Sequence, residues 1–221
     1  MALYIDSAFL NDIMQVAETL PIAGVTTNPT ILLAARERGQ ILNPLQVLNE
    51  LLKSIQGTIF MQPGATEEEK MYQQALAYID TASGRAIPKI PMNQIGMRVA
   101  RRLKQQNHRI AFTAVTSVAQ AYSAAMAGAE FIIPYYGRLA RSGVDANERI
   151  AQMAELLHNE RVPTRILVAS IKSPEEAAQA LLAGAHDLTA SPEVLLDMLS
   201  DPMSEEAVER FSQDWEKMNK L

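Results

Sequence analysis

The stretch AIPKIP, residues 86–91, is apolar except for one charged side chain, that of Lys89. Short apolar runs bounded by turn-forming residues are typical of parallel strands that are covered on both faces. Seven more runs of the same kind occur before and after this one. The sequence therefore predicts eight strands, at residues 2–6, 22–26, 57–62, 85–90, 109–115, 130–135, 165–170 and 186–190.

Segments with a helical spacing of apolar residues lie between these strands, at residues 7–20, 66–80, 92–106 and 173–185. Strands that alternate with helices favour a parallel sheet, and 221 residues leave about 28 for each of eight strand–helix units. A doubly wound sheet is the competing architecture, but a glycine-rich turn usually follows its first strand, and IDSAF at residues 5–9 has no glycine. We predict an α/β fold, a (β/α)8 TIM barrel.

No linker, low-complexity block or change of composition divides the chain. We therefore expect a single (β/α)8 barrel domain over residues 1–221. Residues 204–221 form an additional C-terminal helix in this interpretation, with Val208, Phe211 and Trp215 along one side. Because this helix comes after an eighth barrel helix, its apolar face must cover the barrel or bind a neighbouring subunit.

Composition excludes several classes of function. The net charge of −5 gives no basic surface for nucleic acid or for anionic membranes. The chain has no cysteine, so thiolate metal sites and a cysteine nucleophile are excluded. No apolar run approaches the roughly 20 residues that span a bilayer. We expect a cytoplasmic protein that binds neither nucleic acid nor membranes.

Polar residues stand at the C-terminal end of nearly every predicted strand. In a TIM barrel these strand ends form one rim, where active sites are built. The polar residues at this rim are Asp6, Thr26, Asn28, Gln62, Lys89, Thr113, Tyr135 and Ser170. This distribution predicts a polar site at one end of the barrel.

Lys89 has two interpretations. Burial among apolar neighbours disfavours the charged form of an amine, and a neutral lysine can attack a carbonyl carbon to form a Schiff base. Alternatively, the side chain extends its amine to the surface, or it forms a structural ion pair with Asp6. The ring of polar rim residues supports the catalytic interpretation without excluding the structural one.

Two motifs resemble signatures of the transaldolase family, namely GVTTNPT at 24–30 and KIP at 89–91. The resemblance extends to LYID (3–6), AGAEFIIPYYGRL (127–139), LVASIK (167–172) and DW (214–215), and so covers nearly the whole chain. The sequence is most similar to the short fructose-6-phosphate aldolase group. This resemblance implies sugar phosphate and dihydroxyacetone as ligands. It also implies a homo-oligomer, with a pentamer or decamer among the expected assemblies.

The resemblance also implies catalytic roles for five residues. Lys89 would form the imine with the donor ketone, and Asp6 would hold a donor hydroxyl and steer proton transfer. Gln62 and Thr113 would position a catalytic water, and Tyr135 would work with that water as acid and base. The Schiff base stabilises the carbanion, and the three histidines show no metal-ligand spacing, so no metal and no other cofactor are expected.

Five further residues would bind the substrate in this resemblance. Thr26 and Asn28 would bind donor hydroxyls, and Arg138 and Ser170, helped by Lys172, would grip the phosphate. Several of the assigned residues also have structural alternatives. Asp6 would instead cap a helix beginning near Ala8, and Ser170 would cap a helix beginning near residue 173. The Thr-Asn-Pro sequence at residues 27–29 would form a turn that starts a helix, which is compatible with a role in the site.

The resemblance implies a class I aldolase that cleaves or forms fructose 6-phosphate from dihydroxyacetone and glyceraldehyde 3-phosphate. In transaldolases the positions of Gln62 and Tyr135 are typically Glu and Phe, so these two residues favour the aldolase. A transaldolase that transfers the dihydroxyacetone unit remains the first alternative, and a non-catalytic sugar-phosphate-binding barrel is the second. The sequence departs from the family pattern at Pro88, at Asn93 and in the 140–146 loop, which bears on substrate preference.

Overall fold

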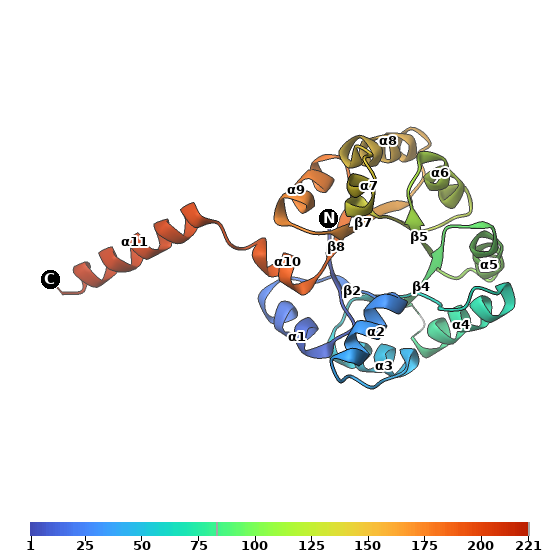
Figure 1. Ribbon diagram of the computed structural model, residues 1–221, viewed down its shortest axis with the longest axis horizontal. Coiled ribbons are helices and arrows are strands. Elements are labelled where there is room, and N and C mark those ends of the chain that lie inside the picture. Colours follow the sequence, from blue (N-terminus) through green and yellow to red (C-terminus); the bar gives the residue numbers. More distant parts are fainter. Residues whose placement is uncertain (83, 221) are drawn as a thin grey trace.

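The computed structural model describes residues 1–82 and 84–220, and in these residues eight parallel strands close into a barrel (Figure 1). Each strand pairs with the next, and β8 pairs with β1, where Thr189 lies opposite Tyr4. The strands are β1 (Leu3–Asp6), β2 (Gly24–Thr26), β3 (Thr58–Met61), β4 (Ala86–Pro91), β5 (Ala111–Val115), β6 (Phe131–Pro134), β7 (Arg165–Ile171) and β8 (Asp187–Ala190). The (β/α)8 barrel is confirmed, and the doubly wound alternative was wrong.

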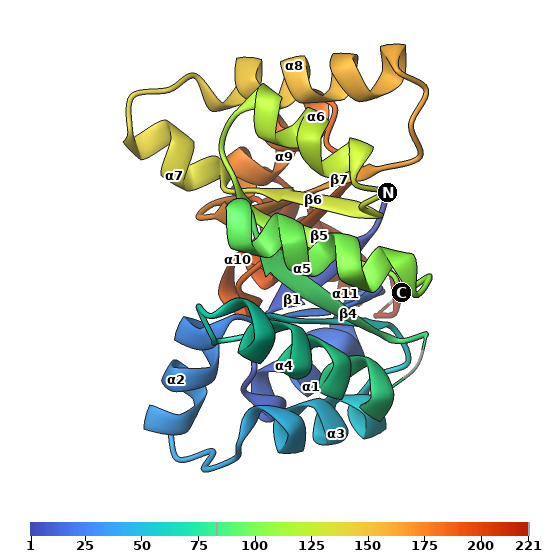
Figure 2. The same cartoon turned by 90° about the vertical axis from the view of Figure 1, so that its right-hand side faces the viewer.

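Helices pack around the outside of the barrel (Figures 1 and 2), except α11, which extends away from it. The helices are α1 (Leu10–Thr19), α2 (Pro29–Glu37), α3 (Pro44–Ser54), α4 (Glu68–Thr81), α5 (Gln94–Gln105), α6 (Val118–Met126), α7 (Tyr136–Arg141), α8 (Ala146–Asn159), α9 (Pro174–Leu182), α10 (Pro192–Asp197) and α11 (Pro202–Met218). The four predicted helical segments correspond to α1, α4, α5 and α9. Several helices begin with proline directly after a capping Asn, Ser or Asp, which is the arrangement that proline favours.

The barrel interior is packed with side chains below its C-terminal end. Phe60 makes edge-to-face contacts with Tyr4 and Phe131, with ring centroids 5.5 and 5.1 Å apart. Side chains alternate along a strand, so the residue two positions after an inward-facing residue also faces inward. Asp6 follows Tyr4 by two positions, and Gln62 follows Phe60 in the same way. The aromatic cluster therefore forms a closed floor beneath the polar rim.

The C-terminal helix α11 projects away from the barrel (Figure 1), and none of its described residues is buried. Val208, Phe211 and Trp215 are each more than 60% exposed: 65%, 68% and 63%. Within residues 1–82 and 84–220, no helix has the length and apolar character that crossing a membrane requires. The helix α11 is therefore an extended arm whose apolar face is exposed.

Candidate active site

A cavity of about 470 Å³ lies among the C-terminal ends of the barrel strands. Its lining residues are Asp6, Asn28, Pro29, Thr30, Ile31, Gln62, Lys89, Tyr135, Arg138, Arg141, Ala169, Ser170 and Lys172. Eight of the ten predicted site residues are therefore brought together here. The other two, Thr26 and Thr113, lie behind the wall and hydrogen-bond to Asp6 and Tyr135.

Lys89 occupies the inner face of β4, two positions after the buried Ile87. Its side chain is only 2% exposed, and desolvation lowers the pKa of its amine, although the charge of Asp6 opposes this effect. Among the described residues, no carboxylate lies within 4.0 Å of this amine. The alternative of a direct ion pair between Lys89 and Asp6 was therefore wrong.

Proline is tolerated next to Lys89 because the pairing of β4 changes partner at this point. Residues Ala86 to Pro88 are in register with β3, whereas Lys89 to Pro91 are in register with β5. A proline removes one ladder donor, which costs least where the pairing is interrupted. The apolar run and its two prolines thus place one amine at the rim of a buried strand.

Asp6 ends β1 and accepts a hydrogen bond of 2.5 Å from Thr26, which lies opposite it on β2. Burial raises the pKa of the Asp6 carboxyl, and the charge of Lys89, the Thr26 hydrogen bond and the charge of Lys172 act in the opposite direction. Asp6 does not cap α1, because that helix begins after Phe9, whose backbone N–H donates to Ser7. Asp6 instead lines the cavity.

Gln62 and Tyr135 offer polar groups on the side of the cavity between β3 and β6. The Oε1 atom of Gln62 is buried and accepts no hydrogen bond from any described residue. A buried polar atom without a partner carries a cost, which a bound water or substrate hydroxyl would remove. Tyr135 accepts a hydrogen bond of 3.0 Å from the buried Thr113, so its own phenolic proton is free.

Two irregular residues shape the rim from the backbone. Ala114 on β5 and Ser170 on β7 have positive φ angles of 59° and 64°, each where the strand register shifts. Such bulges re-aim side chains and are frequent beside active sites. Ser170 does not cap the following helix, because the side chain of Ser173 takes that position at α9. The bulge instead leaves Ser170 at the cavity wall.

Three cations gather at one end of the cavity: Arg138, Arg141 and Lys172. None of them forms an ion pair within 4.0 Å to another described residue. The two arginines lie on α7, whereas Lys172 directly follows β7. The helix α7 packs tightly on β7, since a Cβ at Gly137 would lie 2.3 Å from the carbonyl oxygen of Ser170. This close approach brings both arginines alongside Ser170 and creates an end suited to an anionic group.

Asn28 combines a structural contact with a place in the cavity wall. Its side chain accepts a hydrogen bond from Ile31 N and caps α2, as the turn interpretation predicts, and the same residue lines the cavity. Tyr136 differs from the neighbouring Tyr135, because Tyr136 is buried and its hydroxyl bonds to Asn147.

Arg141 lines the cavity but was not among the residues predicted from the sequence. Its spacing of three residues from Arg138 places both arginines on one turn of a helix and could have indicated it.

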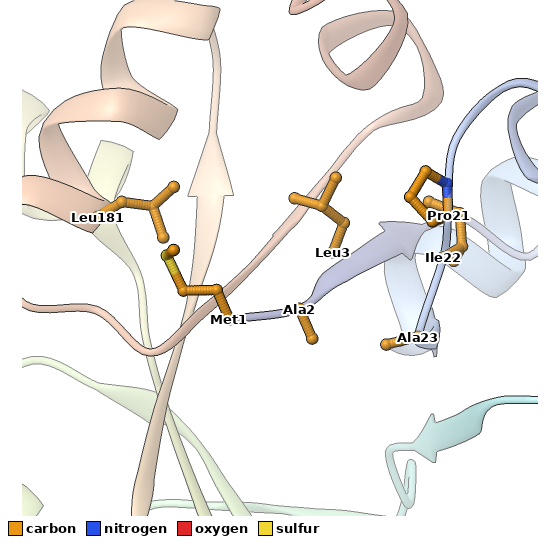
Figure 3. Close-up of a pocket in the computed structure, with 7 residues that line it drawn as sticks. All are labelled: Met1, Ala2, Leu3, Pro21, Ile22, Ala23 and Leu181. Carbon is orange, nitrogen blue, oxygen red and sulfur yellow. The ribbon is translucent and has the colours of Figure 1, made fainter.

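A second cavity of about 460 Å³ is apolar (Figure 3). It is lined by Met1, Ala2, Leu3, Pro21, Ile22, Ala23 and Leu181, at the start of β1 and before β2. These side chains carry no acid, base or nucleophile. The chemistry of the barrel is therefore concentrated at the opposite end, around Lys89.

Comparison with known proteins assigns the chain to a family. The family model for transaldolase/fructose-6-phosphate aldolase matches residues 3–221. A probable transaldolase from Symbiobacterium thermophilum is 35% identical over 216 residues, which cover 98% of this chain and 97% of that protein. The structure of FabK from Thermotoga maritima shares the fold alone, with a TM-score of 0.56 and 13% identity over 86% of this chain and 57% of that one. The chain therefore belongs to the transaldolase/fructose-6-phosphate aldolase family and is an enzyme of the transaldolase and aldolase class.

Proposed function

We propose that this enzyme is a metal-independent class I aldolase that cleaves fructose 6-phosphate to dihydroxyacetone and glyceraldehyde 3-phosphate, and forms it in reverse. The observation that carries the proposal is the buried amine of Lys89, whose pKa is lowered by desolvation and which borders a polar cavity. A lysine that is neutral for a larger fraction of the time is a better nucleophile toward a ketone. The protonated imine then serves as the electron sink.

The reaction follows from this amine. The Lys89 nitrogen attacks C2 of the sugar, and loss of water gives a protonated imine. The C4 hydroxyl gives its proton to the water held beside Gln62 and Tyr135, and the C3–C4 bond breaks. Glyceraldehyde 3-phosphate leaves, and the bonding electrons form an enamine. Protonation at C3 and hydrolysis by one water release dihydroxyacetone and restore the amine. Asp6 accepts a hydrogen bond from a hydroxyl of the donor sugar and assists the proton transfers.

Gln62 and Tyr135 support the aldolase over the transferase. A neutral amide at residue 62 withdraws no proton from the waiting enamine, and the free phenolic proton of Tyr135 is a source of the proton that C3 needs. Thr113 orients that phenol, and a water held near Gln62 passes the proton on. The bound three-carbon unit is then released as a free ketone.

The cationic end of the cavity supports a phosphorylated substrate. Arg138 and Lys172 supply positive charge, and Ser170 supplies a hydroxyl donor. A guanidinium offers paired donors to phosphate oxygens. In this proposal Thr26 affects the donor sugar only through its hydrogen bond to Asp6. Asn28 lies in the cavity wall and would contact the donor sugar directly. The phosphate would fix the aldehyde half of the sugar at the end of the cavity away from Lys89.

The first experiment measures glyceraldehyde 3-phosphate released from fructose 6-phosphate with no acceptor aldehyde present. Sustained release over many turnovers supports the aldolase. Borohydride added with substrate should then label Lys89, identified by peptide mass. A label on Lys172 or Lys104 instead would contradict the proposed nucleophile.

A transaldolase is the second candidate, because the relative that is 35% identical is named a probable transaldolase. In that case no more than one equivalent of glyceraldehyde 3-phosphate per subunit would appear, since the three-carbon unit would stay on Lys89. Addition of an aldose phosphate acceptor would then restore turnover. The same assay therefore separates the two candidates.

A further inference from the structure

Thr189 is a fully buried threonine on β8 that takes no part in the reaction as proposed above. Its Oγ1 lies 2.7 Å from the Oγ1 of Thr26, which in turn lies 2.5 Å from Oδ1 of Asp6. The three side chains belong to neighbouring strands, since β1 pairs with both β2 and β8. They form a continuous chain of hydrogen bonds from the barrel wall to the cavity.

The direction of these hydrogen bonds follows from the number of protons. A threonine hydroxyl carries one proton and accepts through its lone pairs, and an ionised carboxylate only accepts. The single proton of Thr26 is donated to Asp6, so Thr26 cannot also donate to Thr189. Thr189 must therefore be the donor in the contact with Thr26. Both hydroxyl protons then point along the chain toward the carboxylate, and each bond polarises the next.

The charged groups around Asp6 leave its protonation state sensitive to this chain. Titratable groups that share the main cavity with Asp6 are Lys89, Tyr135, Arg138, Arg141 and Lys172. A smaller cavity toward α1 and α10 also borders Asp6 and contains Asp12, Arg38 and Glu193. Burial favours the neutral carboxylic acid, whereas the cations and the hydrogen bond from Thr26 favour the carboxylate. The chain of hydroxyl groups, like the cations, therefore favours the ionised form of Asp6.

We infer that Thr189 is a positioning residue of the active site, which holds the Thr26 hydroxyl with its proton directed at Asp6 and so keeps that carboxyl ionised and fixed in place. The inference rests on the catalytic role proposed for Asp6. Thr189 itself is not part of the lining of the substrate cavity. Its side-chain hydrogen bond is to Thr26, so we expect its effect to pass through that residue.

The first test measures the titration of the Asp6 carboxyl in the substrate-free enzyme by NMR with ¹³C-labelled aspartate. The Asp6→Asn variant identifies the Asp6 signal. Thr189→Val keeps the shape and removes the hydroxyl. We expect the Asp6 titration to move upward by roughly one pH unit, because a hydrogen bond that favours the carboxylate is weakened. Thr189→Ser should restore it. Thr164→Val is the matched control, since Thr164 is another buried threonine, bonded to the carbonyl of Ala129.

The second readout is the pH profile of kcat/KM. Activity that requires ionised Asp6 falls as the pH drops through its pKa, so the acid limb should move upward in Thr189→Val by the same amount as the NMR titration. Thr189→Ala carries the same test if the valine variant fails to fold. The inference would be overturned if Asp6 titrated at the same pH in Thr189→Val as in Thr164→Val. The NMR titration needs no turnover. It therefore tests the role of Thr189 even if the enzyme does not catalyse the proposed reaction.

Discussion

The hydroxyl of Thr113 donates a hydrogen bond of 3.0 Å to the phenolic oxygen of Tyr135. Thr113 is buried behind the cavity wall, whereas Tyr135 lines the cavity. The Arg138 guanidinium lies 5.0 Å from the centre of the Tyr135 ring and packs against it. The phenol is thus held from two sides while its proton remains free for a group in the cavity.

Replacement of Tyr135 by Phe should separate imine formation from ketone release. The variant keeps Lys89, so a single equivalent of glyceraldehyde 3-phosphate should still appear rapidly. Sustained release should fall by about 100-fold or more, because the general acid is gone. Rapid-quench measurement of the burst and of the steady state checks this expectation.

Tyr136→Phe is the matched control, because its hydroxyl bonds to Asn147 away from the cavity lining. We expect near-normal burst and steady-state rates from it. Equal losses in the two variants would show that Tyr135 contributes only to stability. A complete loss of the burst in Tyr135→Phe would instead place it in imine formation.

Lys89→Met should abolish turnover and stabilise the fold. The wild-type amine is buried without an ion pair, so a methionine of similar volume avoids the desolvation cost, roughly 1–3 kcal/mol in the free energy of unfolding. The pKa of Lys89 lies below its ordinary value of 10.5 in the folded state. Between the folded and unfolded pKa values the unfolded chain binds more protons, so wild-type stability rises with pH. The difference in the free energy of unfolding between Lys89→Met and the wild type should therefore decrease as the pH approaches 10.5.

Urea unfolding at several pH values measures this difference. Lys53→Met is the control, since the Lys53 side chain is 69% exposed on α3, and its effect should be small at every pH. A Lys89→Met protein that is less stable than wild type at neutral pH would contradict the prediction. It would mean that the amine stabilises Asp6 by more than its own burial costs.

Arg141→Ala should raise the KM for glyceraldehyde 3-phosphate in the synthetic direction by about tenfold, which corresponds to about 1.4 kcal/mol. The reason is the loss of one of three cations at the end of the cavity. The KM for unphosphorylated glyceraldehyde should not change. Because the contact is electrostatic and partly exposed, salt should reduce the difference.

Arg101→Ala removes another exposed arginine, from the groove beside α5 and away from Lys89. It should leave both KM values unchanged. If Arg141→Ala changed the KM for both aldehydes equally, its role would be structural rather than a contact with phosphate.

The apolar strand runs were sufficient to predict the barrel, because a strand covered on both faces is recognisable from its own residues. Lys89 could be selected for the same reason, as a charge inside such a run. Thr189 could not, since it resembles any β-branched strand residue, and its contact with Thr26 joins positions 163 residues apart. The bulges at Ala114 and Ser170 also depend on pairing between strands, which no local pattern contains.

The apolar face of α11 gives the last prediction. We propose that this helix packs on a neighbouring subunit, because Phe211 and Trp215 are exposed on one side of it and none of its described residues is buried. The double variant Phe211→Ala/Trp215→Ala should sediment as a smaller species than the wild type. Glu209→Ala/Gln213→Ala changes the opposite side of the same helix and should leave the assembly intact. Identical sedimentation of both variants and the wild type would mean that this face does not hold subunits together.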